Sequence, residues 1–153
     1  MITLLSKKIK AFTLLEMLIT MAILAIIAGI GVPVYQSLQT KNNFKVDVDS
    51  LTQSIYRAQS LAQAAKNDSD WSLHFREGEI IIYEGSDFVS RDQSFDEVFK
   101  ISKSNTVAAD NDVSFNKFSG FPKLPTIINV NSLSGEFTSL SLNEVGLVEY
   151  NIQ

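Results

Sequence analysis

The feature that most limits how this chain can fold is the apolar run from Phe12 to Val32, in which Glu16 is the only ionisable side chain. This run has the length of roughly 20 residues that an α-helix needs to cross the hydrocarbon core of a membrane. An ionised side chain at the bilayer centre costs roughly 2.5–3.5 kcal/mol on insertion scales. Glu16 therefore either stays close to the lipid headgroups or acquires a partner.

Three lysines, Lys7, Lys8 and Lys10, precede the apolar run, and no Asp or Glu does. Basic residues that flank a membrane segment favour its cytoplasmic side. This asymmetry predicts a single-pass segment in the inner or cytoplasmic membrane, with a cytoplasmic N-terminus and an extracytoplasmic region after Pro33.

Two ordinary interpretations of the run are open. In a secretory signal peptide the lysines would form the charged region, and Gly29-Ile30-Gly31 would form a small-x-small cleavage site. An apolar region of this length exceeds the usual 7–15 residues of such signals, and an acid inside it is unusual. In an uncleaved anchor, Glu16 would reach back to the headgroups. Neither interpretation explains the position of the acid.

The stretch KAFTLLEMLITMAILAIIAGIGVPVY, residues 10–35, resembles the N-terminal signature of type IV prepilins and type II secretion pseudopilins. In that family a short basic leader ends in a small residue, Phe-Thr-Leu follows, and the mature chain has Glu at position five and Pro at position twenty-two. Counted from Phe12, Glu16 and Pro33 stand at those positions. The chain departs from the family in having Ala11 where Gly is usual.

The resemblance implies a processing and assembly pathway. A prepilin peptidase would cut between Ala11 and Phe12, and the new amino group of Phe12 would often be N-methylated. In a filament, Glu16 would pair with the Phe12 amine of a neighbouring subunit. The implied partners are the peptidase, other pilins or pseudopilins, and an assembly platform with its ATPase. The implied activity is assembly at the membrane and then in a filament or at the cell surface, and not catalysis.

Gly29, Gly31 and Pro33 lie close together and predict a bend or local unwinding, because Gly adds backbone freedom and Pro removes a hydrogen-bond donor. After this point, apolar residues recur at three- and four-residue steps from Val34 to Ala65, which predicts an amphipathic helix. The expected organisation is a leader at 1–11, a membrane or filament-core helix at 12–33, an amphipathic helix at 34–66 and a β-rich region at 67–153.

The β-rich region contains short segments rich in β-branched and aromatic residues. A long helix packed on an antiparallel sheet, an α+β and pilin-like arrangement, would bury the apolar face of both. The Gly146-Leu147-Val148 hairpin resembles H-type minor pseudopilins. The expected strands are Trp71–Phe75, Glu79–Tyr83, Val98–Ser102, Val113–Phe118, Thr126–Val130, Phe137–Leu142 and Leu147–Ile152, with a turn at residues 143–146.

Charge and composition argue against several kinds of site. The chain has 13 basic and 17 acidic side chains, and three of the basic ones precede the apolar run, so the remaining region is clearly acidic. Such a surface lacks the basic stripe that binds phosphates, and direct nucleic-acid binding is not expected. The chain has no cysteine, which excludes disulfides and thiolate metal sites.

The alternative to a filament subunit is an exported β-rich binding or enzymatic domain.

The remaining candidate residues favour structural roles, with no catalytic residue, metal or cofactor expected. His74 is the only histidine and lies in a predicted strand. Residues 114–117 match S-x-x-K without its companion motifs. Residues 68–70 and 110–112 offer carboxylates for Ca²⁺, but neither segment continues as an EF-hand loop. The phenylalanines of FNKFSGFPKLP, Phe115, Phe118 and Phe121, are expected in the core or as anchors of a loop rather than in a binding patch, because large apolar side chains are usually buried.

Overall fold

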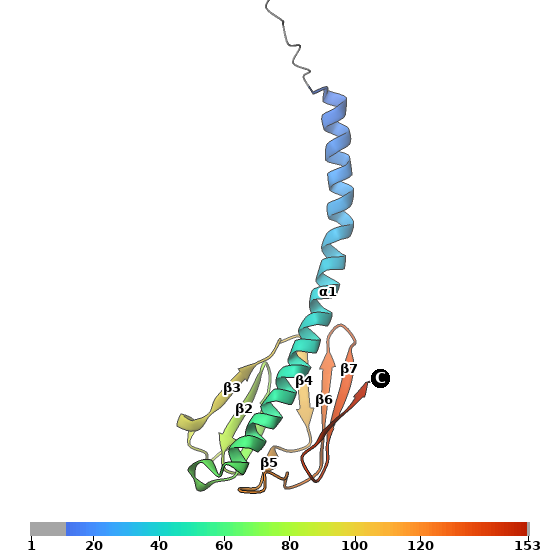
Figure 1. Ribbon diagram of the computed structural model, residues 1–153. Coiled ribbons are helices and arrows are strands. Elements are labelled where there is room, and N and C mark those ends of the chain that lie inside the picture. The colour runs from blue at the N-terminus through green and yellow to red at the C-terminus, as the bar shows by residue number, and fades with distance from the viewer. Residues whose placement is uncertain (1–11, 153) are drawn as a thin grey trace, which may run out of the picture. The chain divides into compact units, whose positions relative to one another are not determined.

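The computed structural model describes residues 12–152 of the chain. The predicted leader and Ala11 lie outside the described residues. The chain divides into two units between Gln39 and Thr40. A single helix, α1 (Leu14–Gln63), contributes its first half to the N-terminal unit and its second half to the C-terminal unit (Figure 1).

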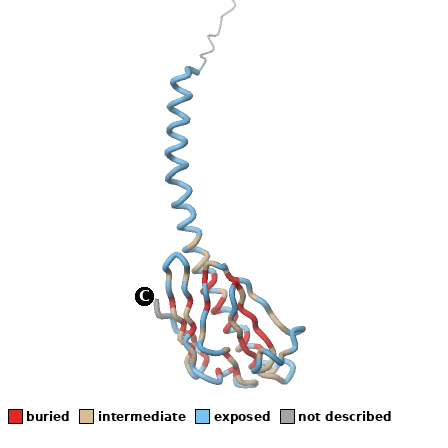
Figure 2. Tube along the Cα trace, turned by 180° about the vertical axis from the view of Figure 1, so that it is seen from behind, coloured by how far each residue is buried: buried red, intermediate tan, exposed pale blue. Residues whose placement is uncertain are grey.

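The first half of α1 is exposed on all sides, as the uniform colour of this helix in Figure 2 shows. The helix includes Gly29, Gly31 and Pro33 without interruption. Pro33 has no N–H, so the carbonyl of Gly29 loses its usual intrahelical partner. The bend or unwinding expected at these residues stays a prediction.

The second half of α1 buries one face. The expected stripe is confirmed at Val48, Leu51, Ile55, Ala58 and Ala62, which are all buried. The helix ends at Gln63, three residues before the expected end at Lys66. The reason is Ala65, which adopts a left-handed conformation with φ of 46° and starts a short 3-10 helix, η1 (Lys66–Asp68).

Eight strands follow α1 and form two antiparallel four-stranded sheets rather than the one expected sheet. The first sheet has the order β3-β2-β1-β5 and the second has the order β4-β6-β7-β8. A second 3-10 helix, η2 (Gln93–Phe95), precedes β3. The strands are β1 (Trp71–Arg76), β2 (Glu79–Glu84), β3 (Glu97–Lys100), β4 (Asn105–Ala109), β5 (Val113–Phe115), β6 (Thr126–Ser132), β7 (Phe137–Leu142) and β8 (Val148–Ile152).

Each expected strand overlaps an observed one, and β4 was missed. β4 and β5 follow each other closely, but β4 pairs with β6 whereas β5 pairs with β1. The chain therefore passes from one sheet to the other at residues 110–112. The hairpin between β7 and β8 is confirmed, since the Asn143 N–H donates to the Leu147 carbonyl at 3.1 Å.

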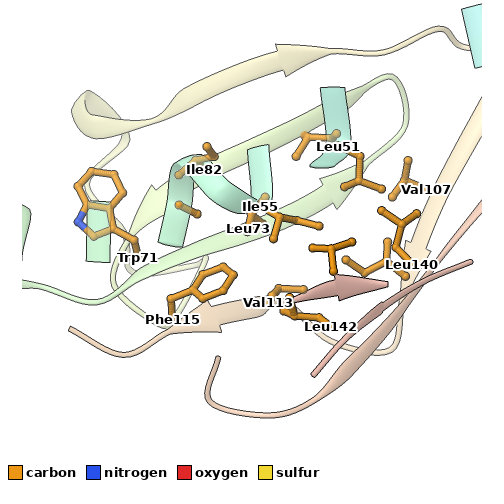
Figure 3. Packing of buried hydrophobic residues seen from close by; sticks show 14 of the residues in the cluster. Leu51, Ile55, Trp71, Leu73, Ile82, Val107, Val113, Phe115, Leu140 and Leu142 are labelled. Atoms are coloured by element: carbon orange, nitrogen blue, oxygen red, sulfur yellow. The ribbon is translucent and has the colours of Figure 1, made fainter. Parts of the chain in front are cut away.

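The core lies between α1 and the inner faces of both sheets (Figure 3). Leu51 and Ile55 of α1 are completely buried there. Burying an aliphatic side chain of this size contributes about 1.5–3 kcal/mol relative to leaving it exposed. The sheets contribute Trp71, Leu73, Ile82, Val107, Val113, Phe115, Leu140 and Leu142. The α+β architecture, one long helix packed on antiparallel β-structure, is thereby confirmed.

Candidate functional site: the N-terminal segment of α1

Thr13 caps the N-terminus of α1. Its Oγ1 accepts a hydrogen bond from the Glu16 N–H at 3.2 Å. Thr13 and Glu16 are three residues apart, which is the spacing of the capping box, in which an N-cap hydroxyl satisfies an otherwise free N–H of the first turn. This role of Thr13 was missed in the sequence, although the pattern T-x-x-E was visible.

Glu16 lies in the first turn of α1 and is exposed. A carboxylate is stabilised at this end of a helix because the aligned peptide dipoles place partial positive charge there. Within residues 12–152, no cationic side chain pairs with the Glu16 carboxylate.

The remainder of this segment is an uncovered apolar surface. The first half of α1 is long and apolar enough to cross a membrane. Phe12 precedes the helix and is 69% exposed. The other exposed large side chains of the segment are Leu14, Leu15, Met17, Leu18, Ile19, Met21, Ile23, Leu24, Ile26, Ile27, Ile30, Val32, Val34, Tyr35 and Leu38. Exposing such a large apolar surface to water is unfavourable, so we expect lipid or another protein to cover it.

Gly29 and Gly31 have no side chain, so the helix is thinner at these two positions of the apolar surface. A Cβ atom built on either glycine would have no heavy atom within 4 Å, apart from neighbours in the same helix. Small residues on a membrane helix allow a second helix to approach closely. Packing within the chain does not require glycine at either position.

His74 has a structural environment on the outer face of the first sheet. Its Nδ1 lies 2.8 Å from Asp112 Oδ1, and its ring stacks on Phe88 at 3.7 Å between centroids. The Tyr83 hydroxyl donates to Asp112 Oδ2 at 2.8 Å. Burial, and then the Asp112 carboxylate, raise the pKa of Tyr83 far above its ordinary value. Among the described residues, His74 forms its hydrogen bond with Asp112 and its ring contact with Phe88, and no Ser, Thr or Lys side chain hydrogen-bonds to it.

The S-x-x-K match is not assembled as a site. Ser114 Oγ accepts a hydrogen bond from Ser72 Oγ at 2.8 Å, whereas Lys117 Nζ forms an ion pair with Asp68 at 2.8 Å. The two side chains that the motif would join therefore have separate partners.

The acidic segments are also engaged in structural contacts. Asp70 forms an ion pair with Lys123 at 2.7 Å and accepts from the Lys117 N–H at 2.8 Å. Burial alone would raise the pKa of Asp70, but these hydrogen bonds outweigh it and lower the pKa below its usual value. Residues 12–152 contain no group of three or more His, Cys, Asp or Glu side chains that could hold a metal ion.

The three phenylalanines of FNKFSGFPKLP have different positions. Phe115 is completely buried, as expected. Phe118 and Phe121 are 68% and 47% exposed, so of the two expected roles, core or loop anchor, the core is wrong for both. Phe118 follows β5, which ends at Phe115, and has a φ of 69°, outside the extended conformation of a strand.

The sequence model described as the prokaryotic N-terminal methylation motif matches residues 6–32. No curated protein and no solved structure matches the chain. The matched residues include the capped start of α1, the exposed Glu16 carboxylate and the uncovered apolar surface. The chain thus carries a type IV pilin-like prepilin signal, which indicates a prepilin-processed protein of the pilin or pseudopilin kind.

Proposed function

We propose that this chain is a minor pilin or pseudopilin, a structural subunit of a type IV pilus or a type II secretion-like filament. A prepilin peptidase would cut it between Ala11 and Phe12, and the first half of α1 would then join the filament. The observation that supports this most is the exposed Glu16 carboxylate, which stands on an apolar helix without a cationic partner in residues 12–152.

Cleavage between Ala11 and Phe12 would create a new cation, the α-amino group of Phe12, that could pair with the Glu16 carboxylate. A free α-amino group is largely protonated at neutral pH, and N-methylation keeps its charge. The Phe12 amine of one subunit would meet Glu16 of its neighbour among apolar helices, where a charge pair is much stronger than in water. The cost of holding the carboxylate in the membrane would be offset only on assembly.

Gly29, Gly31 and Pro33 would serve the same assembly. The open space around both glycines would let a neighbouring helix approach closely. Pro33 weakens the hydrogen bonding of the helix at the same place. We therefore assign these three residues to a segment that melts or bends when the subunit leaves the membrane.

The chain would be anchored in the cytoplasmic membrane with its N-terminus inside and residues after Pro33 outside, in agreement with Lys7, Lys8 and Lys10. Sibling pilins, the assembly platform and its ATPase would be its further partners. The β7–β8 hairpin near the end of the chain contains Gly146. This hairpin supports assigning the chain to the H-type subclass of minor pseudopilins.

The experiment that tests this function is intact mass measurement with N-terminal sequencing of the protein from its native membrane. It compares a host that has prepilin peptidase with one that lacks it. A peptidase-dependent start at Phe12, especially with one added methyl group, is the expected result. A start at Val32 would instead make the chain an exported β-rich domain released by an ordinary signal. A start at Met1 in both hosts would make it a plain membrane anchor.

A further inference from the structure

The C-terminal unit has one end at which α1 enters it. The β3–β4 connection and the β6–β7 turn lie at this end (Figure 1). We call it the entry end and define it by residues 40–49, 76–79, 100–105 and 132–137. Three hydrogen bonds join these segments: from the Ser102 N–H to Asp47 Oδ2 at 2.9 Å, from the Ile101 N–H to the Gly78 carbonyl at 3.0 Å and from the Leu133 N–H to the Ser104 carbonyl at 2.9 Å. The entry end is therefore one connected surface.

The lysines of the entry end are exposed, and none of them forms an ion pair within residues 12–152. They are Lys41, Lys45, Lys100 and Lys103. Lysines at the opposite end differ, because Lys117 pairs with Asp68 at 2.8 Å and Lys123 with Asp70 at 2.7 Å. The ammonium groups of the entry end are thus available to an anion outside the chain.

Three of the five carboxylates at the entry end are engaged within the chain. Asp47 is buried and accepts the hydrogen bond from Ser102, and Glu79 pairs with Arg76. Glu136 accepts a hydrogen bond from the Ser134 hydroxyl, which is the main cause of its lowered pKa, and Lys41 adds a smaller Coulombic effect. The two other carboxylates, Asp49 and Glu77, are exposed.

The two ends of the C-terminal unit therefore differ in charge. The entry end has five basic and five acidic side chains, whereas the remainder of residues 40–152 has five basic and eleven acidic ones. A membrane surface that contains anionic lipid attracts exposed lysines and repels an acidic surface. Of the two ends, the entry end is the one that such a surface favours.

Leu133 adds an apolar group to the entry end. It lies in the β6–β7 turn and is 87% exposed. A lone exposed leucine is common on protein surfaces, but this one shares its end of the unit with the four unpaired lysines. An aliphatic side chain beside lysines suits the membrane interface, because the aliphatic group enters the headgroup layer while the ammonium groups contact the phosphates.

The connection to α1 keeps the entry end close to lipid. Seven residues, 33–39, separate the C-terminal unit from the apolar run that ends at Val32. Seven residues span at most about 25 Å even when the chain is fully extended. When the apolar run crosses the bilayer, the entry end is therefore within reach of the headgroups, whatever the angle at which α1 leaves the membrane.

We propose that the entry end binds the anionic lipid headgroups of the membrane that α1 spans, with Lys41, Lys45, Lys100 and Lys103 on the phosphates and Leu133 in the headgroup layer. This inference rests on the membrane anchoring that is part of the proposed function. It goes beyond that function by naming lipid as a binding partner of the C-terminal unit. The contact holds the unit in one orientation on the membrane before assembly and is broken when the subunit leaves.

Fluorescence quenching in vesicles tests the proposal, since the protein has no cysteine of its own and can be labelled at one chosen position. The full chain with Leu133→Cys, labelled with a fluorophore, is reconstituted into vesicles of phosphatidylcholine and phosphatidylglycerol. Lipids that carry a spin label in the headgroup region are expected to quench the fluorophore. Quenching should be weaker in vesicles of phosphatidylcholine alone. Equal quenching in both kinds of vesicle would overturn the recognition of anionic headgroups.

The matched label position is Val145→Cys, because Val145 is also an exposed apolar residue in a turn and lies outside the entry end, between β7 and β8. Its fluorophore should not be quenched by the headgroup spin label. Equal quenching at positions 133 and 145 would show adsorption without a preferred end and would overturn the proposal.

The role of the lysines is tested in the chain labelled at position 133. Lys103→Gln should lower the ratio of lipid-bound to free C-terminal units roughly fivefold, which is the contribution of one lysine near an anionic surface. Lys117→Gln makes the same change of charge at the opposite end and should leave the ratio unchanged. An equal effect of the two variants, or no effect of Lys103→Gln, contradicts the assignment of the entry-end lysines.

A label in the apolar run separates this proposal from the proposed function. Leu24→Cys, labelled in the same way, should be quenched by lipids that carry the spin label deep in the acyl chains. Quenching at position 24 without quenching at position 133 would overturn the headgroup contact and leave the proposed function standing. Absence of quenching at position 24 would contradict the membrane segment itself, and with it the proposed function.

Discussion

Arg57 of α1 is joined to Glu97 of β3 by two parallel hydrogen bonds, from Nε to Oε2 at 3.0 Å and from Nη2 to Oε1 at 2.9 Å. This pair connects the helix to the outermost strand of the first sheet. Trp71, the only tryptophan, is completely buried nearby in the core, so its fluorescence reports unfolding of the C-terminal unit.

The Arg57–Glu97 pair predicts a pH-dependent contribution to stability. The hydrogen bonds from Arg57 lower the pKa of Glu97 below its ordinary value of 4.5, against a smaller opposing effect of burial. The contribution is therefore complete above pH 4.5 and is lost as the pH falls through the folded-state pKa. Because the Arg57 side chain is 48% exposed, Arg57→Met should lower the free energy of unfolding by only about 0.2–1 kcal/mol at pH 7. Urea titrations followed by Trp71 fluorescence should show this difference at pH 7, and the difference should shrink as the pH is lowered below 4.5. A difference that does not change with pH would assign the effect to packing.

Asp47 is a buried carboxylate that secures the turn between β3 and β4. It accepts hydrogen bonds from the Ser102 N–H at 2.9 Å and from Asn105 Nδ2 at 2.6 Å. Asn105 Oδ1 is buried without a partner, so Asp47→Ala would leave the whole Asn105 amide unsatisfied. We expect a loss of about 2–3 kcal/mol in the free energy of unfolding, because buried donors to a charged group lose their acceptor.

Asp47→Asn is the matched variant, since it keeps one acceptor of similar shape and should cost less than Asp47→Ala. Hydrogen exchange of the Ser102 amide should quicken in the alanine variant. Equal stabilities of the two variants would contradict this role of the carboxylate.

Position 120 requires glycine for two reasons, its backbone conformation and the atoms around it. It has a φ of 64°, and a Cβ atom there would lie 2.2 Å from Gln63 Cγ. Gly120→Ala should therefore lower the free energy of unfolding by more than the roughly 1–2 kcal/mol that the left-handed conformation alone costs. Gly78→Ala is the control, because Gly78 has a similar φ of 76° and its added Cβ would meet only an ordinary contact, 3.6 Å from Lys103 Cγ. Urea titration of both variants separates the steric clash from the backbone strain, and equal losses would show that Gln63 moves aside freely.

Glu16 and Thr13 can be varied separately because the cap of α1 uses the main-chain N–H of Glu16 and not its carboxylate. Glu16→Ala should leave membrane insertion intact or improve it, and should strongly reduce incorporation into the filament. Losing one partner of a buried charge pair typically costs 3–5 kcal/mol. The measurement is the ratio of variant to wild-type chain that co-purifies with filaments.

Thr13→Val is the control for this experiment. It removes the cap, at a cost of about 1 kcal/mol in helix stability, and keeps the carboxylate. Incorporation of Thr13→Val should stay close to that of the wild type. Co-purification of Glu16→Ala at the wild-type level would contradict pairing with the Phe12 amine.

The local features of this chain could be predicted because neighbouring residues determine them. The long helix, the stripe at Leu51, Ile55 and Ala58, and the β7–β8 hairpin are confirmed. Helical periodicity and turn chemistry act over a few residues, so they can be read without knowledge of the fold. The end of α1 was placed too late because nothing local marked Ala65 as left-handed.

The N-terminal segment could be recognised from neighbouring residues alone: a run long enough to span a membrane, one acid near its start and the prepilin signal around it. The sheet that each strand joins and the burial of each aromatic side chain depend instead on contacts between residues far apart in the sequence. β4 and β5 are close in sequence and belong to different sheets because their partners, β6 and β1, lie far apart along the chain. Phe115 is buried and Phe118 is exposed for a similar reason. The N–H of Phe118 bonds to Ala62, at the distant end of α1, and this long-range contact turns the chain out of the sheet.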